Sequence, residues 1–301
     1  MDAPRLTVFS VPLVSTWVLD ETHRILFDAG DGAAAMLEGR ILRANIVALT
    51  HAHRDHIGGL PQLLNLRAQG AEAPTLSIVH PAGSGAIGAM ARFLARLDPA
   101  TTGTLSWAEW NAGDQLELEH HHRLIAFGTR HIPGGAGTAS RSLGYRVERT
   151  VSRLRPELRG LPQSELDQMW RSSGRDAITR DEVETVLAVS GDTTVLTPDE
   201  VGHARFLLHE CTFLELDSDA FESVRQRGHE HSSLDEVLQL AADAGVERLA
   251  LYHISRRYAD DEIVRLVRAR CAARHLAASV SVAFPGRVTT DIFGQAVWPG
   301  V

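Results

Sequence analysis

Three histidines and one aspartate lie within six residues in the segment Thr50-His51-Ala52-His53-Arg54-Asp55-His56. The segment directly follows the apolar residues 46–49, which we expect to form a strand, so a turn at its end can direct alternate side chains into one cavity. Imidazole and carboxylate groups without a thiolate suit zinc, manganese or iron. The spacing therefore predicts a metal site formed by His51, His53, Asp55 and His56.

Three residues farther along the chain are candidates to complete this site. They are His131, Asp192 in Ser190-Gly191-Asp192-Thr193, and His253 in Tyr252-His253-Ile254-Ser255. Each has a plain structural explanation when taken alone: His131 could be exposed, Asp192 could serve the Gly-Asp turn, and His253 could be buried at a strand end. We interpret the further run His120-His121-His122 as a surface cluster.

The pattern His-x-His-x-Asp-His after a strand resembles the signature of the metallo-β-lactamase superfamily. Asp28-Ala29-Gly30 resembles the Asp-x-Gly loop of that superfamily, and the similarity extends over residues 6–293. The three downstream candidates match the remaining superfamily ligands in order. The resemblance implies two metal positions, one held by His51, His53 and His131, the other by Asp55, His56 and His253, with Asp192 bridging them.

Such a pair of ions has a defined chemistry. Two cations about 3.5–4 Å apart can share a water, lower its pKa towards ~7 and clamp an in-line displacement at a phosphate. The resemblance thus implies two divalent ions, zinc before manganese or iron, and a hydroxide held by them as the nucleophile. Asp55 could in addition orient this hydroxide, although a role as a ligand alone is the simpler prediction.

A second set of motifs lies between residues 209 and 258. His209-Glu210-Cys211-Thr212-Phe213, His231-Ser232-Ser233 and the segment 253–258 closely resemble motifs of ribonuclease Z, the family of endonucleases that remove the 3′ trailer from precursor tRNA. This resemblance implies a homodimer, and it implies that Glu210 and His231 form a proton-donating pair beside the metals. A carboxylate that orients an imidazole is a sound general acid. A buried structural pair is the alternative.

The elements that must position these residues alternate short apolar or β-branched runs with helical stretches. We expect strands at residues 5–10, 16–19, 24–27, 46–50, 76–79, near 105, 116 and 124, and at 143–147, 185–189, 206–209 and 248–252. We expect helices at 33–40, 59–69, 86–97, near Pro198, at 233–244, where Ser233 and Glu236 fit a capping box, and at 260–274. Two β-rich halves with helices outside predict an α/β protein, an αββα sandwich of two mixed sheets.

Residues 149–180 interrupt this alternation. Seven arginines outnumber four acidic residues there, although the chain has a formal charge of −8. We interpret the segment as a partly helical arm inserted into a single domain, residues 1–301, and an ordinary charged surface loop is the alternative. Bacterial ribonuclease Z proteins usually carry in this interval an arm with a Gly-Pro-rich element that grips tRNA. The centre here reads Gly160-Leu161-Pro162-Gln163 instead, which leaves a tRNA grip open.

The composition is that of a folded protein, with 44% apolar and 23% charged residues. No stretch approaches the roughly 18 apolar residues of a membrane span, and the first residues lack the apolar core of a signal peptide, so we expect a cytoplasmic location. The only cysteines, Cys211 and Cys271, are too few for a disulfide framework and are expected to be reduced. The acidic balance argues mildly against a surface coated with nucleic acid.

The leading hypothesis is a metal-dependent phosphodiesterase of the ribonuclease Z type acting on precursor tRNA. The alternative enzyme is a hydrolase for a small molecule, such as a cyclic nucleotide or another ester, because a fold does not determine a substrate. The acidic balance and the altered arm favour this alternative, whereas Glu210 and His231 favour the nuclease. A non-catalytic binding protein of the same fold is disfavoured because no ligand position is missing.

Overall fold

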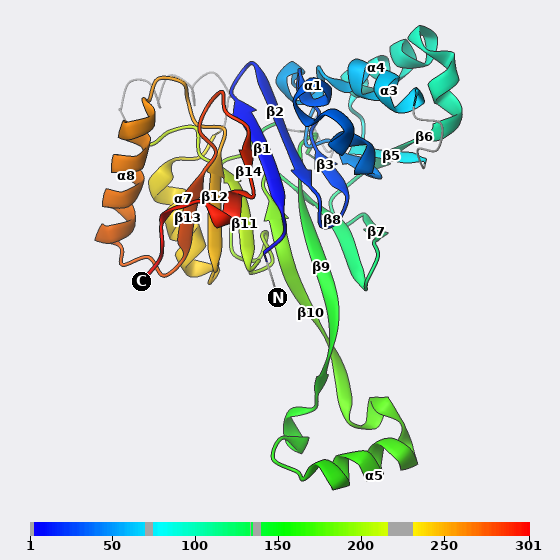
Figure 1. The fold of residues 1–301 in the computed structure, drawn as a ribbon, viewed down its shortest axis with the longest axis vertical. Coiled ribbons are helices and arrows are strands. Elements are labelled where there is room, and N and C mark those ends of the chain that lie inside the picture. The colour runs from blue at the N-terminus through cyan, green and yellow to red at the C-terminus, as the bar shows by residue number, and fades with distance from the viewer. Residues whose placement is uncertain (1–2, 70–74, 133, 135–139, 216–230) are drawn as a thin grey trace.

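The computed structural model describes residues 3–69, 75–132, 134, 140–215 and 231–301. Within these residues, two β-sheets pack face to face and carry helices on their outer faces (Figure 1). One sheet has the strand order β14-β1-β2-β3-β4-β5-β6, and the other β15-β13-β12-β11-β10-β9-β8-β7. Both sheets are mixed. In the first sheet, β3 pairs in parallel with β4 and antiparallel with β2. In the second sheet, β10 pairs in parallel with β11 and antiparallel with β9. The predicted αββα sandwich of two mixed sheets is confirmed.

The first sheet comes mainly from the N-terminal part of the chain. Its strands are β1 (Leu6–Val11), β2 (Ser15–Asp20), β3 (Ile25–Phe27), β4 (Ile46–Ala48), β5 (Leu76–Pro81), β6 (Leu105–Trp110) and β14 (Thr289–Thr290). Its helical elements are α1 (Ala33–Leu37), η1 (Glu38–Arg43), α2 (Arg54–Ile57), α3 (Leu60–Ala68), α4 (Gly85–Leu97) and η2 (Pro99–Thr104). The helix expected at 33–40 ends early because Glu38 adopts a positive φ of 49°.

The second sheet contains most of the later strands. These are β7 (Gln115–Glu117), β8 (His122–Gly128), β9 (Leu143–Leu154), β10 (Thr179–Val189), β11 (Phe206–Glu210), β12 (Arg248–Tyr252), β13 (Ser279–Val282) and β15 (Ala296–Trp298). Its helices are α7 (Leu234–Asp243) and α8 (Asp260–Ala273), and the short turn η5 (Ile292–Gly294) precedes β15. The capping box of Ser233 and Glu236 is present at the start of α7, as predicted.

The prediction of a helix near Pro198 is wrong. Residues 198–203 form turns, because Gly202 and His203 both have positive φ angles, 62° and 50°, which end the first helical turn. Among the described residues, no helix is long and apolar enough to cross a membrane.

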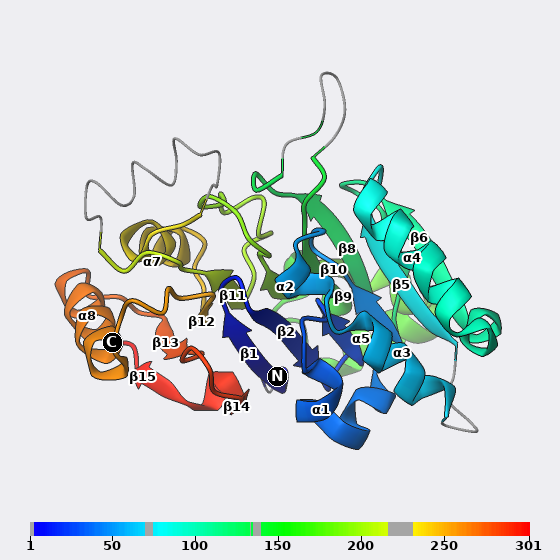
Figure 2. The ribbon, with the colours of Figure 1, turned by 90° about the horizontal axis from the view of Figure 1, so that it is seen from above.

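Apolar layers separate the elements. Seen from above, α7 and α8 lie on one side, α3 and α4 on the other, and the strands between them (Figure 2). Between the sheets, side chains such as Phe27, Leu124 and Leu208 form a core of their own. The buried Tyr145 donates a hydrogen bond of 2.7 Å to the carbonyl of Leu49, which joins the second sheet to the segment directly before His51. The second sheet therefore anchors the backbone that leads into the histidine-rich segment.

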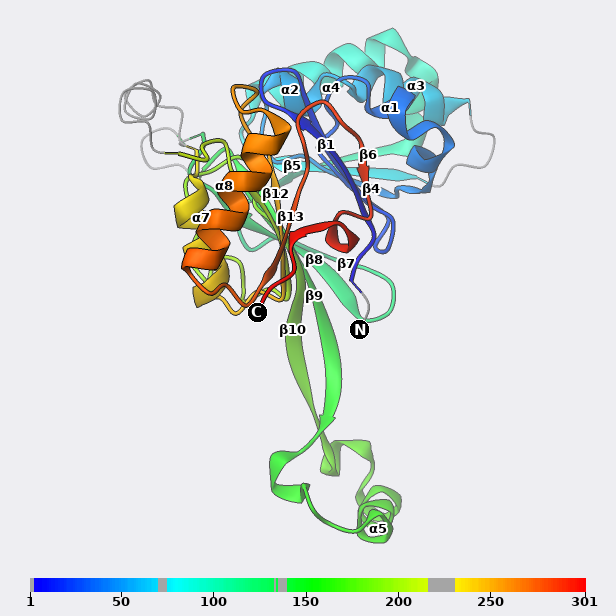
Figure 3. The same ribbon diagram turned by 60° about the vertical axis from the view of Figure 1, so that its left-hand side comes forward.

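Residues 149–180 project from the sandwich (Figures 1 and 3). Strands β9 and β10 continue outwards as a two-stranded ribbon, paired as far as Leu154 and Thr179, and the tip contains η3 (Pro156–Leu158), α5 (Gln163–Ser173) and η4 (Arg175–Ala177). No strand was predicted between residues 149 and 180, whereas β9 and β10 extend into both ends of this segment. A ribbon exposed on both faces buries no apolar side, so it shows no apolar alternation. The division into one domain with an inserted arm remains a prediction.

Gly30 illustrates how tightly the site-bearing loops pack. A Cβ atom at this position would lie 2.3 Å from the carbonyl oxygen of Asp55 and 2.5 Å from the amide nitrogen of Thr16. Neither backbone atom can move without shifting the element that holds it, α2 for Asp55 and β2 for Thr16. Gly30→Ala should therefore lower the free energy of unfolding by about 1–3 kcal/mol, the usual range for an overpacked site.

Thermal unfolding of purified variants measures this effect. Gly39→Ala is the matched control, because nothing lies within 4 Å of a Cβ at that exposed position. Equal melting temperatures for the two variants would contradict the packing described for Gly30.

Candidate metal centre

The motif residues converge because they follow strands at one edge of both sheets. Asp28 follows β3, the segment from His51 follows β4, and His131 follows β8. Asp192, Thr212 and His253 follow β10, β11 and β12, which run parallel to one another. The carboxyl ends of these strands are where ligand sites of α/β folds are expected.

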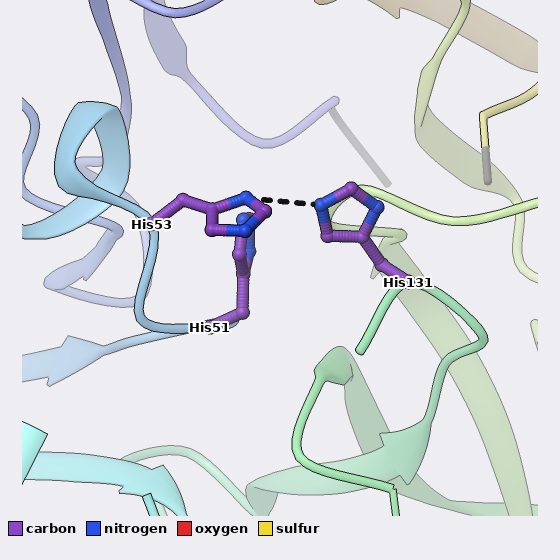
Figure 4. Close-up of side chains that lie close together, drawn as sticks. All are labelled: His51, His53 and His131. Carbon is purple, nitrogen blue, oxygen red and sulfur yellow. Dashed lines mark hydrogen bonds between the residues drawn. The ribbon is translucent and has the colours of Figure 1, made fainter. Parts of the chain in front are cut away.

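His51, His53 and His131 form the first group (Figure 4). The Nε2 atom of His131 lies 3.1 Å from the Nδ1 atom of His53, and the His51 ring lies 4.6 Å and 4.7 Å from their rings, centroid to centroid. Two nitrogens bound to one tetrahedral zinc at ~2.05 Å lie about 3.3 Å apart. The group therefore has the spacing needed to hold one ion.

Asp55, His56 and His253 form the second group, with ligand atoms within 4.8 Å of one another. The Oδ2 atom of Asp55 lies 3.8 Å from Nε2 of His56 and 4.0 Å from Nε2 of His253. These three residues are buried. A carboxylate and two imidazoles again form a donor set for a divalent cation.

Asp192 lies between the two groups. Its Oδ2 atom is 3.9 Å from the Nε2 atoms of His51 and His131, 3.4 Å from that of His56 and 3.2 Å from that of His253. One carboxylate thus faces both candidate metal positions. This is the arrangement expected of a bridging ligand, although the assignment of all seven residues as ligands remains a prediction.

Several buried atoms of the cluster are left without a hydrogen-bond partner. They are the Nε2 atoms of His51, His56 and His253 and the Oδ1 atom of Asp192. His253 Nε2 has Asp192 Oδ2 at 3.2 Å, but the geometry of that contact is not that of a hydrogen bond. Unpaired polar groups in the interior are costly and rare. The residues therefore fit divalent cations, which would use these lone pairs.

Local electrostatics favour cation binding by His51, Asp55 and Asp192. Burial lowers the pKa of His51 well below its usual value, so its imidazole is neutral. Burial alone would raise the pKa of Asp192, but His253 and His56 hold it well below its ordinary value. The same holds for Asp55: burial alone would raise its pKa, but His253 and His56 lower it to about 2. Ionised carboxylates therefore face imidazole nitrogens.

Glu210 and His231 lie on the same side of the cavity. Their Oε1 and Nδ1 atoms are 3.0 Å apart, and the His231 ring stacks on that of His253 with centroids separated by 5.3 Å. Burial alone would lower the pKa of His231, but the Glu210 carboxylate raises it to about 9. The backbone amides of Thr193 and Ser232 also donate to Oε1 of Glu210. The arrangement can hold a proton on His231 beside the metal groups.

His231 has a second possible role by position. It belongs to two further sets of potential ligands, one with His131 and Asp192 and one with Glu210 and His253. The proton-donating role predicted for the pair therefore stays a prediction. The run His120-His121-His122 lies apart from this centre; His120 and His121 are exposed, as expected for a surface cluster.

Sequence reasoning missed the residues that orient the metal groups. Asp28 accepts hydrogen bonds from Nδ1 of His56 at 2.7 Å and from the Thr50 amide at 2.7 Å. The Asp-x-Gly motif marked this aspartate without assigning it a partner. The amide of Leu13 donates to Oδ2 of Asp55 at 2.9 Å. No sequence signal pointed to Leu13, because the contact uses its backbone.

Comparison with known families identifies the framework of this site. Residues 23–154 match the family model described as the beta-lactamase superfamily domain. The match covers 132 of the 301 residues, and it shows that this region of the chain is similar to that domain. This domain supplies every member of the His51 to His56 segment and His131, whereas Asp192 and His253 follow it in the chain.

Similar proteins extend the comparison over the rest of the chain. Ribonuclease Z of Staphylococcus carnosus is 28% identical over 257 residues, which cover 77% of this chain and 78% of that protein. The metallo-β-lactamase fold protein YhfI of Bacillus subtilis has a TM-score of 0.62 at 16% identity, covering 96% and 100% of the two chains. Human tRNase Z, short form, has a TM-score of 0.60 at 18% identity, covering 95% and 99%.

Together, this superfamily domain, the metallo-β-lactamase fold and the relatives indicate a metal-dependent hydrolase. Both cysteines are free and buried, as expected, and neither joins the metal groups.

Proposed function

We propose that the protein is a two-metal phosphodiesterase of the ribonuclease Z type that removes the 3′ trailer from precursor tRNA. The observation that carries the proposal is the pair formed by the buried Glu210 and the partly buried His231, placed against the seven candidate ligands, His51, His53, Asp55, His56, His131, Asp192 and His253. Relatives named ribonuclease Z support it at 28% identity. We propose two divalent ions, zinc before manganese or iron, because the donor set is rich in imidazole.

The chain's own residues divide the work. Two divalent ions, when bound, supply positive charge for the phosphate oxygens and acidify a water. Asp192 faces both positions, and Asp55, besides contributing one carboxylate oxygen, can orient the attacking group. Glu210 holds the Nδ1–H of His231, which leaves the opposite ring nitrogen to donate a proton to the leaving oxygen.

The arm has exposed charge that could hold a long substrate. Of its seven arginines, four pair with Glu157, Glu182 or Glu184, whereas Arg159, Arg171 and Arg175 are exposed and form no ion pair within the part of the chain that the structure describes. The tip of the arm, which carries these three arginines, lies beyond the amino end of β10, and Asp192 follows the carboxyl end of that strand, roughly 30 Å away at ~3.3 Å per residue. A small phosphodiester at the metals cannot reach the arm.

Shortening the arm tests this division of tasks. Residues 153–180 are replaced by Asn-Gly, which joins the cross-strand partners Ser152 and Asp181 through a tight hairpin turn. We expect unchanged hydrolysis of bis(p-nitrophenyl) phosphate and at least a roughly 10-fold loss of precursor-tRNA cleavage, because distant phosphate contacts position a folded RNA. Cleavage rates for both substrates, measured over a salt series, give the answer.

A charge variant controls for loss of the arm's bulk. Changing Arg159, Arg171 and Arg175 together to Gln keeps the arm. It should make precursor-tRNA cleavage less dependent on salt, because fewer phosphate contacts release fewer counterions on binding. If both variants cleave precursor tRNA as well as the intact protein, the arm has no part in binding it.

A hydrolase for a small phosphodiester or other ester is the second candidate. The Gly160-Leu161-Pro162-Gln163 centre of the arm and the formal charge of −8 favour it. Robust hydrolysis of a small phosphodiester without any precursor-tRNA cleavage by the intact protein would select this function. We also propose a homodimer, by resemblance to ribonuclease Z, which sedimentation equilibrium tests directly.

A further inference from the structure

The hydroxyl of Thr212 lies between the proton-donating pair and a candidate metal ligand. Its Oγ1 atom is 2.9 Å from Oε2 of Glu210 and 3.1 Å from Nδ1 of His253. The carbonyl of His253 is also 3.1 Å away. Thr212 is buried, so no water competes freely for these contacts. The side chain therefore joins two groups that sequence reasoning treated separately.

Counting protons assigns the direction of each hydrogen bond. The hydroxyl has one proton, and a carboxylate can only accept, so Thr212 donates to Glu210, the charged and closer of its two oxygen acceptors. The lone pairs of Thr212 Oγ1 then accept the Nδ1–H of His253. This tautomer leaves a lone pair on Nε2 of His253, the atom that lies 3.2 Å from Asp192 and has no hydrogen-bond partner.

A second threonine, which follows β4, makes the same arrangement. The Oγ1 atom of Thr50 is 2.8 Å from Oδ2 of Asp28 and 2.9 Å from Nδ1 of His51. The Nε2 atom of His51 also lacks a partner. A buried carboxylate, a threonine hydroxyl and an imidazole therefore occur in the same order twice, once after a strand of each sheet. This repetition argues that the hydroxyl contact with His253 orients its imidazole and is not a packing accident.

We propose that Thr212 is a positioning residue that couples the metal centre to the proton-donating pair. Its hydroxyl sets the tautomer of His253 and holds Oε2 of Glu210, while Oε1 of the same carboxylate holds His231. One buried carboxylate thereby supports both halves of the site. The effect on metal binding follows from geometry alone, whereas the effect on turnover rests on the proposed function.

Two variants separate the hydroxyl from its side-chain volume. Thr212→Val removes the hydroxyl at nearly constant shape, and Thr212→Ser keeps it. We expect Thr212→Val to weaken zinc affinity by about 10–100-fold, the usual cost of losing a partner that orients a histidine ligand. Thr212→Ser should restore affinity to near that of the unchanged protein. Thr289→Val, at a buried threonine on β14 outside the site, is the matched control and should bind zinc normally.

Zinc competition against a chromophoric chelator measures affinity, and ¹⁵N spectra of histidine-labelled, metal-free protein report the tautomer of His253. A protonated Nε2 on His253 in the unchanged protein would overturn the proposal even if Thr212→Val failed to fold. Equal zinc affinities for Thr212→Val and the unchanged protein would also overturn it. If zinc affinity falls as expected but the unchanged protein hydrolyses no phosphodiester, the proposed function fails and the positioning of His253 stands.

Discussion

Asp192→Ala should yield a folded protein that retains no tightly bound metal and hydrolyses no phosphodiester. Asp192 places one oxygen within 3.9 Å of four imidazole nitrogens, those of His51, His56, His131 and His253. Without it, both metal positions lose a carboxylate that faces them both, and two cations would repel each other without that bridging charge. Elemental analysis of the purified protein and a phosphodiesterase assay measure the two losses together.

A buried carboxylate elsewhere serves as the matched control. Asp20 is fully buried and accepts hydrogen bonds from the amides of Thr22 and His23 at the turn after β2. These contacts involve none of the candidate metal ligands. Asp20→Asn should lower stability yet retain metal. If Asp20→Asn loses metal as completely as Asp192→Ala, metal loss reflects general destabilisation and does not identify Asp192 as a ligand.

His53→Ala should have a similar but less complete effect, because it removes one member of the first group only.

A stability measurement adds an independent check. A ligand that binds only the folded state raises the melting temperature, so chelation should lower the melting temperature of the unchanged protein. Chelation should have no such effect on Asp192→Ala. A metal-loaded Asp192→Ala protein would contradict the bridging assignment.

The sequence predicted the histidine-rich segment because all its candidate ligands lie within six residues shortly after a strand. His51, His53, Asp55 and His56 needed no knowledge of distant contacts. His131, Asp192 and His253 were different, since spacing alone left each with an ordinary explanation, and only their order in a resembling family connected them. The structure brings all seven together because their strands end at one edge.

The contacts that orient these ligands depended on strand register. Asp28 meets His56 only because β3 pairs in parallel with β4, and Thr212 meets His253 only because β11 pairs with β12. Local patterns do not encode which strands become neighbours. The strands of the arm were not predicted for a different reason. Because neither face of this ribbon is buried, its residues lack the apolar alternation by which strands are predicted.

His231→Ala should lower turnover by roughly 10²–10⁴ on substrates with a poor leaving group, while metal content stays unchanged. The physical reason is that an alkoxide must be protonated as the bond to phosphorus breaks, and His231 lies beside both metal groups with its Nδ1 held by Glu210. A precursor RNA or a dinucleotide is such a substrate. Turnover under saturating substrate, with metal content measured in the same samples, gives the comparison.

The choice of leaving group separates proton donation from other roles of His231. A p-nitrophenolate leaves without needing a proton, so His231→Ala should cost far less with bis(p-nitrophenyl) phosphate than with a dinucleotide. Glu210→Gln should show the same dependence more weakly, because it leaves His231 in place but removes the charge that holds its proton. An equal loss on both substrates would contradict general-acid catalysis. Loss of metal from His231→Ala would instead make His231 a ligand, as its closeness to His131 and Asp192 allows.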